Sequence, residues 1–188
     1  MVNETASVAA GAIIEKALKD LVEQFKKDSN LATLTPEDIA VQGLGGGRKY
    51  TFDAEYKTTT SPTLVSYLYT IYQDTLGAHP NAYFRTFVFD AQGTQVRAVT
   101  GLPHTNPNLL EELSLLVSND VTRQMRERTG QDDISGSIFA EGLAPNEENF
   151  QNFLVDGETL LIEIPPYQVA AYAVGSFEVR IPMKDILQ

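Results

Sequence analysis

The chain has 188 residues, a formal net charge of −11 and 43% hydrophobic residues, so it can form one domain with a sizeable core. It contains no cysteine, which excludes disulfides, zinc–thiolate sites and a cysteine nucleophile. No run of about 18 apolar residues is present, and residues 1–4 lack the basic and apolar regions of a signal peptide.

The N-terminal part is predicted to contain one long helix. Residues 6–27 carry apolar residues at helical spacing. Thr35 and Pro36 have the form of a second, short helix start, although a strand at 39–41 is an alternative. Residues 43–47 (GLGGG) precede an alternating strand rather than a helix, so a flexible loop is favoured over a phosphate-binding loop.

A meander of strands is predicted next. Alternation indicates a strand over 50–57, and aromatic-rich runs indicate strands over 63–73 and 82–90, followed by a short strand over 94–98. The short connections favour antiparallel pairing. Because residues 63–73 are apolar or aromatic on both faces, we expect that strand to be central.

A second long helix is predicted to begin at Asn106 as its cap and to end at Gly130. Its buried stripe is expected to consist of Leu109, Leu113, Leu116, Val117, Val121 and Met125.

The C-terminal part is predicted to be mainly strand. Residues 145–150 indicate a short helix, and Asp156-Gly157 indicates a hairpin between strands at 152–155 and 159–164. A last strand is expected over 176–181.

Together these elements predict an α+β fold, with an antiparallel sheet of about five to seven strands and two main helices packed on it. We expect a single domain over 1–188. Its possible sub-regions are 1–104, a helix plus strand meander, and 105–188, a helix plus C-terminal strands.

The charge is unevenly distributed along the chain. Residues 1–104 hold 9 basic and 11 acidic residues, whereas residues 105–188 hold 5 basic and 14 acidic ones. No Lys or Arg occurs between Arg128 and Arg180. Such a field disfavours nucleic acid and attracts basic partners, while a solvated surface that aids solubility is the simpler interpretation.

Residues that could carry catalysis are few. His79 and His104 are the only histidines, and neither has a second histidine at metal-ligand spacing. No G-x-S-x-G motif is present. We therefore expect no catalytic residue, no metal site and no cofactor, and interpret His79 as a side chain that hydrogen-bonds across its turn.

Two distant segments carry a family resemblance. The motif positions are Gly77, His79 and Pro80 in GAHPN, and Tyr167, Tyr172 and Gly175 in PPYQVAAYAVG. Between and after them come the strand YFRTFVFD, a long helix, the Asp156-Gly157 turn and a final strand that ends in Ile-Pro. In this order and spacing the chain resembles the RsiV-like ectodomain family. This ectodomain is shared by the lysozyme-sensing anti-sigma-V factor, some polysaccharide deacetylases and many bacterial exported proteins.

The resemblance implies a location outside the cytoplasm (exported, periplasmic or membrane-anchored) and a precursor with an N-terminal signal or anchor. It implies a structural role for the motif residues and no catalytic role. The best-understood relative binds lysozyme, a small basic protein. Since no sigma-binding part or membrane helix is present here, a complete transmembrane signalling role is not expected.

Our first hypothesis is a non-catalytic bacterial binding module for a basic protein such as lysozyme. The expected partner-binding residues are Asp132, Asp133, Glu141, Glu147 and Glu148. An alternative is a module for cell-wall glycan (peptidoglycan), with Tyr67, Tyr69 and Tyr72 as stacking platforms. A second alternative is a hydrolase with an unrecognised site.

Overall fold

The computed structural model describes residues 4–76, 79–134 and 138–187. Two long helices, α1 (Glu4–Asp28) and α3 (Leu109–Thr129), accompany a short helix, α2 (Pro36–Val41). The large sheet contains β1 (Thr51–Thr60), β2 (Leu64–Asp74), β3 (Asn81–Asp90) and β4 (Gln95–Val96). The small sheet contains β5 (Phe153–Asp156), β6 (Thr159–Ile164) and β7 (Phe177–Pro182).

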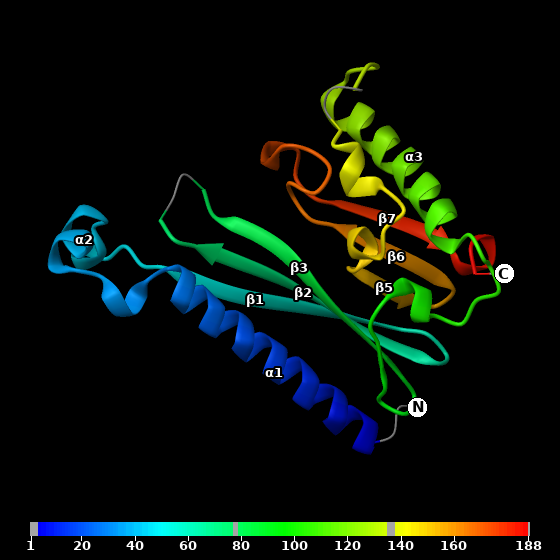
Figure 1. Ribbon diagram of the computed structural model, residues 1–188, viewed down its shortest axis with the longest axis horizontal. Coiled ribbons are helices and arrows are strands. Elements are labelled where there is room, and N and C mark those ends of the chain that lie inside the picture. Colours follow the sequence, from blue (N-terminus) through cyan, green and yellow to red (C-terminus); the bar gives the residue numbers. More distant parts are fainter. Residues whose placement is uncertain (1–3, 77–78, 135–137, 188) are drawn as a thin grey trace.

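The predicted α+β class is confirmed. Neighbouring strands are antiparallel throughout, but they form two sheets, in the orders β1-β2-β3-β4 and β5-β6-β7 (Figure 1). The sequence pattern did not indicate this division, because it shows where strands are but not which distant strands pair. None of the helices in the described ranges is long and apolar enough to cross a bilayer.

The helix α1 covers one face of the large sheet (Figure 1). Its buried residues Ala10 and Ile14 pack against Phe87 and Phe89 of β3. The rings of Tyr67 and Tyr69 meet those two phenylalanines edge-on, with ring centroids 6.2 and 5.9 Å apart. Burial of such apolar surface is what holds an amphipathic helix on a sheet.

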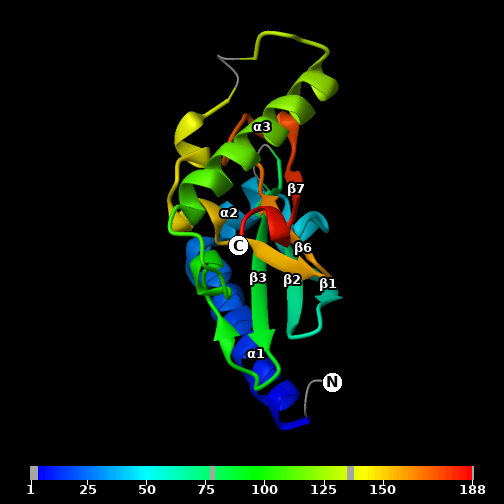
Figure 2. The same cartoon turned by 90° about the vertical axis from the view of Figure 1, so that its right-hand side faces the viewer.

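The helix α3 covers one face of the small sheet, alongside β6 and β7 (Figure 2). Five residues of the predicted stripe are buried there: Leu109, Leu113, Val117, Val121 and Met125. The prediction was wrong for Leu116, which is 36% exposed. Residues 113, 117, 121 and 125 recur every four positions, so position 116 falls to the side of the stripe.

The predicted cap of α3 at Asn106 was also wrong. The helix begins at Leu109, and Asn108 holds the cap position without a side-chain bond. Asn106 is instead buried, where its Nδ2 donates to Glu112 Oε2 and to the carbonyl of Ile186, both at 2.9 Å. It thereby ties the C-terminal segment to the start of α3.

Several local predictions are confirmed. Thr35 and Asp38 form a capping box at the start of α2. Residues 39–41 are therefore part of this helix and not the alternative strand. The glycine-rich segment, expected to be a loop, contains a short 3₁₀ turn, Leu44–Gly46, and the strand β1 follows it as predicted. At the β5–β6 hairpin, Gly157 has a φ of 59°, which glycine adopts readily.

The two sheets meet through β5, which lies against the face of the large sheet opposite α1. Three hydroxyl groups, one from each long strand, donate to backbone carbonyls of the β5 segment. Thr59 Oγ1 donates to Val155 O at 2.8 Å, and Thr86 Oγ1 donates to Gln151 O at 3.1 Å. The buried Ser66 Oγ donates to Val155 O at 3.4 Å and accepts from Val155 N at 3.0 Å. An apolar cluster of Leu68, Phe84, Leu154 and Leu161 fills the same contact.

A charged group also joins the sheets. Lys57 Nζ of β1 lies 3.0 Å from Glu163 Oε1 and 3.1 Å from Glu178 Oε2, which face each other on β6 and β7. Burial raises the pKa of Glu163 above 4.5, although its bond to Lys57 opposes the shift. Burial also favours a higher pKa for Glu178, but hydrogen bonds from Lys57 and Arg180 outweigh it and lower the pKa below 4.5. Burial opposes the charge on Lys57, and its two bonds to the carboxylates nevertheless raise its pKa above 10.5.

We predict that Lys57→Met lowers the free energy of unfolding by about 1–3 kcal/mol at neutral pH, because it leaves the buried Glu163 carboxylate without its partner. Without Lys57 the pKa of Glu163 rises further, so the folded variant binds a proton that the unfolded chain does not. The loss should therefore shrink as the pH falls towards 4.5. Urea unfolding at neutral pH and near pH 4.5 measures the free energy of unfolding of both chains. A loss that is independent of pH would contradict it, and adding Glu163→Gln should reduce the loss at neutral pH.

Candidate functional site

The predicted partner-binding acids fall into two groups along α3. Asp132 and Asp133 follow the C-terminal end of the helix and are exposed. Glu141, Glu147 and Glu148 lie on two short 3₁₀ segments, Ala140–Leu143 and Glu147–Phe150. A bond from Ser114 Oγ to Leu143 O fixes the first segment beside the first half of α3. The structure therefore does not bring all five acids together.

We call Glu141, Glu147 and Glu148 the acidic patch. The two 3₁₀ segments are joined by Asn149, whose Nδ2 donates to Glu141 O at 2.8 Å and to Ala144 O at 3.0 Å. All three glutamates are exposed, and none forms an ion pair within the part of the chain that the structure describes. Glu147 accepts a hydrogen bond from the Thr100 hydroxyl.

Other acids of the C-terminal part are paired with cations. Arg123 pairs with Asp120 and Glu127, and Arg180 lies 3.5 Å from Asp156 and 2.8 Å from Glu178. Near the other predicted acids, Arg126 Nε donates to the backbone carbonyl of Asp132 at 3.0 Å. Within the described residues, cations thus pair with many acids but not with those of the acidic patch.

The three tyrosines of the glycan hypothesis do not form one platform. Tyr67 and Tyr69 are half-buried under α1, whereas Tyr72 is 41% exposed on the opposite face. Sequence alternation had indicated this separation, because position 72 differs in parity from 67 and 69.

Tyr72 lines a hollow of about 370 Å³ on the large sheet, together with Asp53, Glu55 and Thr70. In the β1–β2 register Asp53 lies opposite Tyr72, and Glu55 lies opposite Thr70. An exposed ring beside two carboxylates is an arrangement suited to hydroxyl-rich ligands. We did not predict Asp53 and Glu55 as site residues, although strand alternation places both on one face.

The two halves of the family motif meet in space. The His79 ring stacks on Tyr172 with centroids 4.1 Å apart, and Tyr167 Oη lies 3.0 Å from His79 Nε2. His79 Nδ1 lies 2.9 Å from the carbonyl of Pro80, to which it donates because a carbonyl oxygen can only accept. Gly77, the first motif residue, lies outside the described residues.

The loop between β6 and β7 is held from other sides as well. Gln168 Nε2 donates to Gly142 O and to Asn149 O, both at 2.9 Å. A Cβ at Gly142 would lie 2.0 Å from the Gln168 carbonyl oxygen, so only glycine fits there. At the other end of the loop, Arg128 donates to Val174 O and Ser176 O at 3.1 and 2.8 Å.

The remaining histidine and the carboxylates form no metal centre in the described residues, where no group of three or more potential ligands occurs. His104 Nδ1 lies 3.0 Å from the carbonyl of Asn106.

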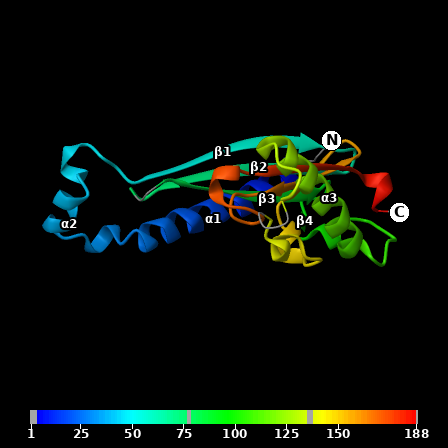
Figure 3. The same cartoon turned by 90° about the horizontal axis from the view of Figure 1, so that it is seen from above.

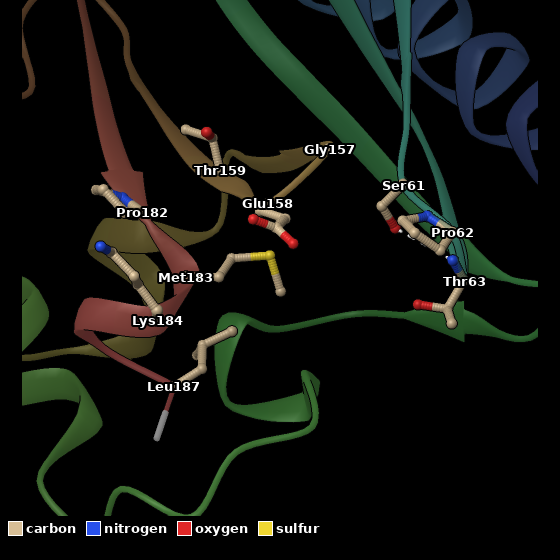
Figure 4. Close-up of a pocket in the computed structure, with 10 residues that line it drawn as sticks. All are labelled: Ser61, Pro62, Thr63, Gly157, Glu158, Thr159, Pro182, Met183, Lys184 and Leu187. Carbon is tan, nitrogen blue, oxygen red and sulfur yellow. Dashed lines mark hydrogen bonds between the residues drawn. The ribbon is translucent and has the colours of Figure 1, made fainter.

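A larger hollow of about 680 Å³ lies at the other end of the large sheet (Figure 4). Residues 61–63, 157–159 and the C-terminal segment line it, with Met183 pointing into it. Two backbone bonds tie these segments together, from Gly157 N to Thr60 O and from Met183 N to Glu158 O. Its lining holds Glu158 and Lys184 and includes no histidine.

The fold and these surfaces define a mixed α+β domain of two antiparallel sheets, each carrying one long helix. Residues 105–184 match the model of the DUF3298 family, described as a protein of unknown function. The match begins where our predicted second sub-region begins. The prediction of a single domain over 1–188 stays a prediction.

Two solved structures are similar to the chain. A DUF3298 family member from Bacteroides fragilis NCTC 9343 has 18% identity and a TM-score of 0.59, over 95% of this chain and 69% of that one. A DUF3298 family protein from Pseudomonas aeruginosa PAO1 has 14% identity and a TM-score of 0.47, over 80% and 66%. The first likeness supports the fold alone. A comparison with curated proteins gives no match, and the narrower RsiV-like resemblance stays a prediction.

We predict that Tyr172→Ala frees the loop between β6 and β7, because it removes the ring that stacks on His79. An aromatic contact contributes about 0.5–1.5 kcal/mol beyond its buried area. Amide hydrogen exchange of residues 167–176 should become faster, with smaller changes in α1. Tyr167→Phe is the control that removes only the hydroxyl bond. Unchanged exchange in Tyr172→Ala would show that the stacking does not hold the loop.

Proposed function

We propose that the protein is a non-catalytic binding domain that recognises a basic protein, such as a lysozyme, through the acidic patch. The observation that supports this most directly is a set of three exposed glutamates, none of which has a paired cation among the described residues, on a molecule of net charge −11. Unpaired charges of one sign attract an oppositely charged partner over distances of about a Debye length.

The construction of the patch also favours this proposal. Ser114 donates to Leu143 O of the first 3₁₀ segment, and the Asn149 side chain of the second segment donates to Glu141 O and Ala144 O. The backbone of both segments therefore needs little ordering on binding. Arg123 and Arg180, which would weaken the field, are already paired with other acids.

We further propose that the domain acts outside the cytoplasm. This location rests on the resemblance to the RsiV-like ectodomain family alone. Fractionation of cells that express the natural gene with a C-terminal tag would test it, and a tag found only in the cytosolic fraction would contradict it.

A titration against lysozyme by surface binding kinetics tests the partner. We expect binding at low salt that weakens as salt rises. Replacing Glu141, Glu147 and Glu148 with glutamine should lower the association rate constant by about tenfold. No binding of lysozyme at low salt would end the lysozyme proposal.

A matched control separates the patch from total charge. The variant Asp120→Asn, Glu127→Gln, Asp156→Asn removes the same three charges, but from acids that are paired with arginines. It should bind almost as the natural chain does. If both triple variants lose the same affinity, net charge rather than the acidic patch governs association.

A second candidate function, glycan binding, is favoured by the hollow that contains Tyr72. If it holds, insoluble peptidoglycan should retain the protein at high salt, and Tyr72→Ala should remove that retention, because stacking on a ring is not screened by salt. Phe139→Ala, which truncates another exposed ring, is the control. Retention that Tyr72→Ala leaves intact would contradict a role for this hollow.

A further inference from the structure

The strand β1 is a long free edge of the large sheet. It pairs with β2 over all ten residues, from Thr51 opposite Asp74 to Thr60 opposite Val65, without a bulge. Among the described residues no strand pairs with its other side, and Figure 3 shows β1 along the outer margin of the sheet. The opposite edge, β4, has only two residues.

This edge is accessible as well as long. Residues 53–58 are all exposed. Because α1 packs on β2 and β3, it leaves Tyr56 65% exposed, stacked on Tyr69 with ring centroids 5.3 Å apart. Unpaired backbone N–H and C=O groups on such an edge are a template for another strand.

Edge strands commonly carry charges that block pairing, since like charges then meet. Here the order of the charges has the opposite effect. Glu55, Tyr56 and Lys57 are consecutive, so an antiparallel copy with Tyr56 opposite the partner's Tyr56 places each Glu55 opposite the partner's Lys57.

Neighbouring registers are less favourable. A shift by one pair in one direction places Glu55 opposite the partner's Glu55, although each Asp53 then meets the partner's Lys57. A shift in the other direction places Lys57 opposite the partner's Lys57. Both put like charges in direct contact, which is destabilising. The proposed register has two attractive pairs and no repulsive pair among these residues. Shifts by a whole residue pair are the ones that keep the α1 face of one copy level with the α1 face of the other, because side chains alternate along a strand.

We propose that two copies of this chain pair through β1 in that register, forming one continuous sheet of eight strands around a twofold axis at Tyr56. In this assembly a row of four tyrosines, Tyr69 and Tyr56 with their partners, crosses the junction on the α1 side. Stacked aromatic pairs across strands are among the stronger cross-strand contacts.

Lys57 can keep its bonds to Glu163 and Glu178 while it also pairs with Glu55 of the partner copy. Its ammonium has three donors, of which Glu163 and Glu178 accept two, and its side chain is 48% exposed. Glu55 has no ion-pair partner among the described residues, so pairing with the partner's Lys57 breaks no existing bond of the carboxylate.

A cysteine cross-link tests the register, because the chain has no cysteine of its own. Opposite residues of an antiparallel pair have Cβ atoms about 4.5–5.5 Å apart, within reach of a disulfide. We expect Tyr56→Cys to form a disulfide-linked dimer on mild oxidation. Thr58→Cys, on the same face, should not, since its copies would lie about 13 Å apart. Equal cross-linking of the two variants would overturn the proposed register.

Sedimentation velocity of the unmodified chain, which contains no cysteine, gives the second readout. We expect a concentration-dependent dimer that Glu55→Lys weakens by about tenfold or more, since two pairs of like charges then meet. The matched control is Asp53→Lys, which makes the same charge change opposite the partner's Thr59 and should dimerise nearly as the natural chain does. A chain that stays monomeric at all concentrations would overturn the proposal.

Discussion

The contact between β5 and the large sheet holds the two halves of the molecule together. A strand at the edge of a three-stranded sheet has backbone groups that need partners, and burial makes each unpaired group costly. Here Thr59, Ser66 and Thr86 supply those partners from three adjacent strands, so the sequence of the first half satisfies the backbone of the second. Lys57 adds a charged bond at the same contact, which ties its geometry to the ionisation of Glu163.

Two basic residues act at internal joints: Lys57 between the sheets, and Arg128 at the loop between β6 and β7. Others, such as Arg123 and Arg180, pair with acids on the surface. The acidic patch, which makes no ion pair in the described residues, is left to face the solvent. Its negative field is therefore not offset by an ion pair among the described residues.

Much of the fold could be predicted from local sequence. Period-four apolar residues indicated α3, and Asp156-Gly157 indicated the hairpin, because each depends on neighbours in the chain. The division into two sheets could not be predicted, since it depends on Ser66 meeting Val155, 89 residues away. Asn106 was misread for the same reason, because its partner Ile186 is 80 residues away. The residues of the acidic patch could be proposed from the charge distribution along the sequence. The structure was needed to show which acids form no ion pair among the described residues.

The position of Gly142 has a consequence for how such a domain varies between species. Its α-carbon faces the Gln168 carbonyl so closely that no side chain can be accommodated without moving the backbone. Chains that present the same two-tyrosine loop should therefore keep glycine at the equivalent place even where little else is retained. A substitution there would mark lineages in which the backbone of the loop has been rebuilt.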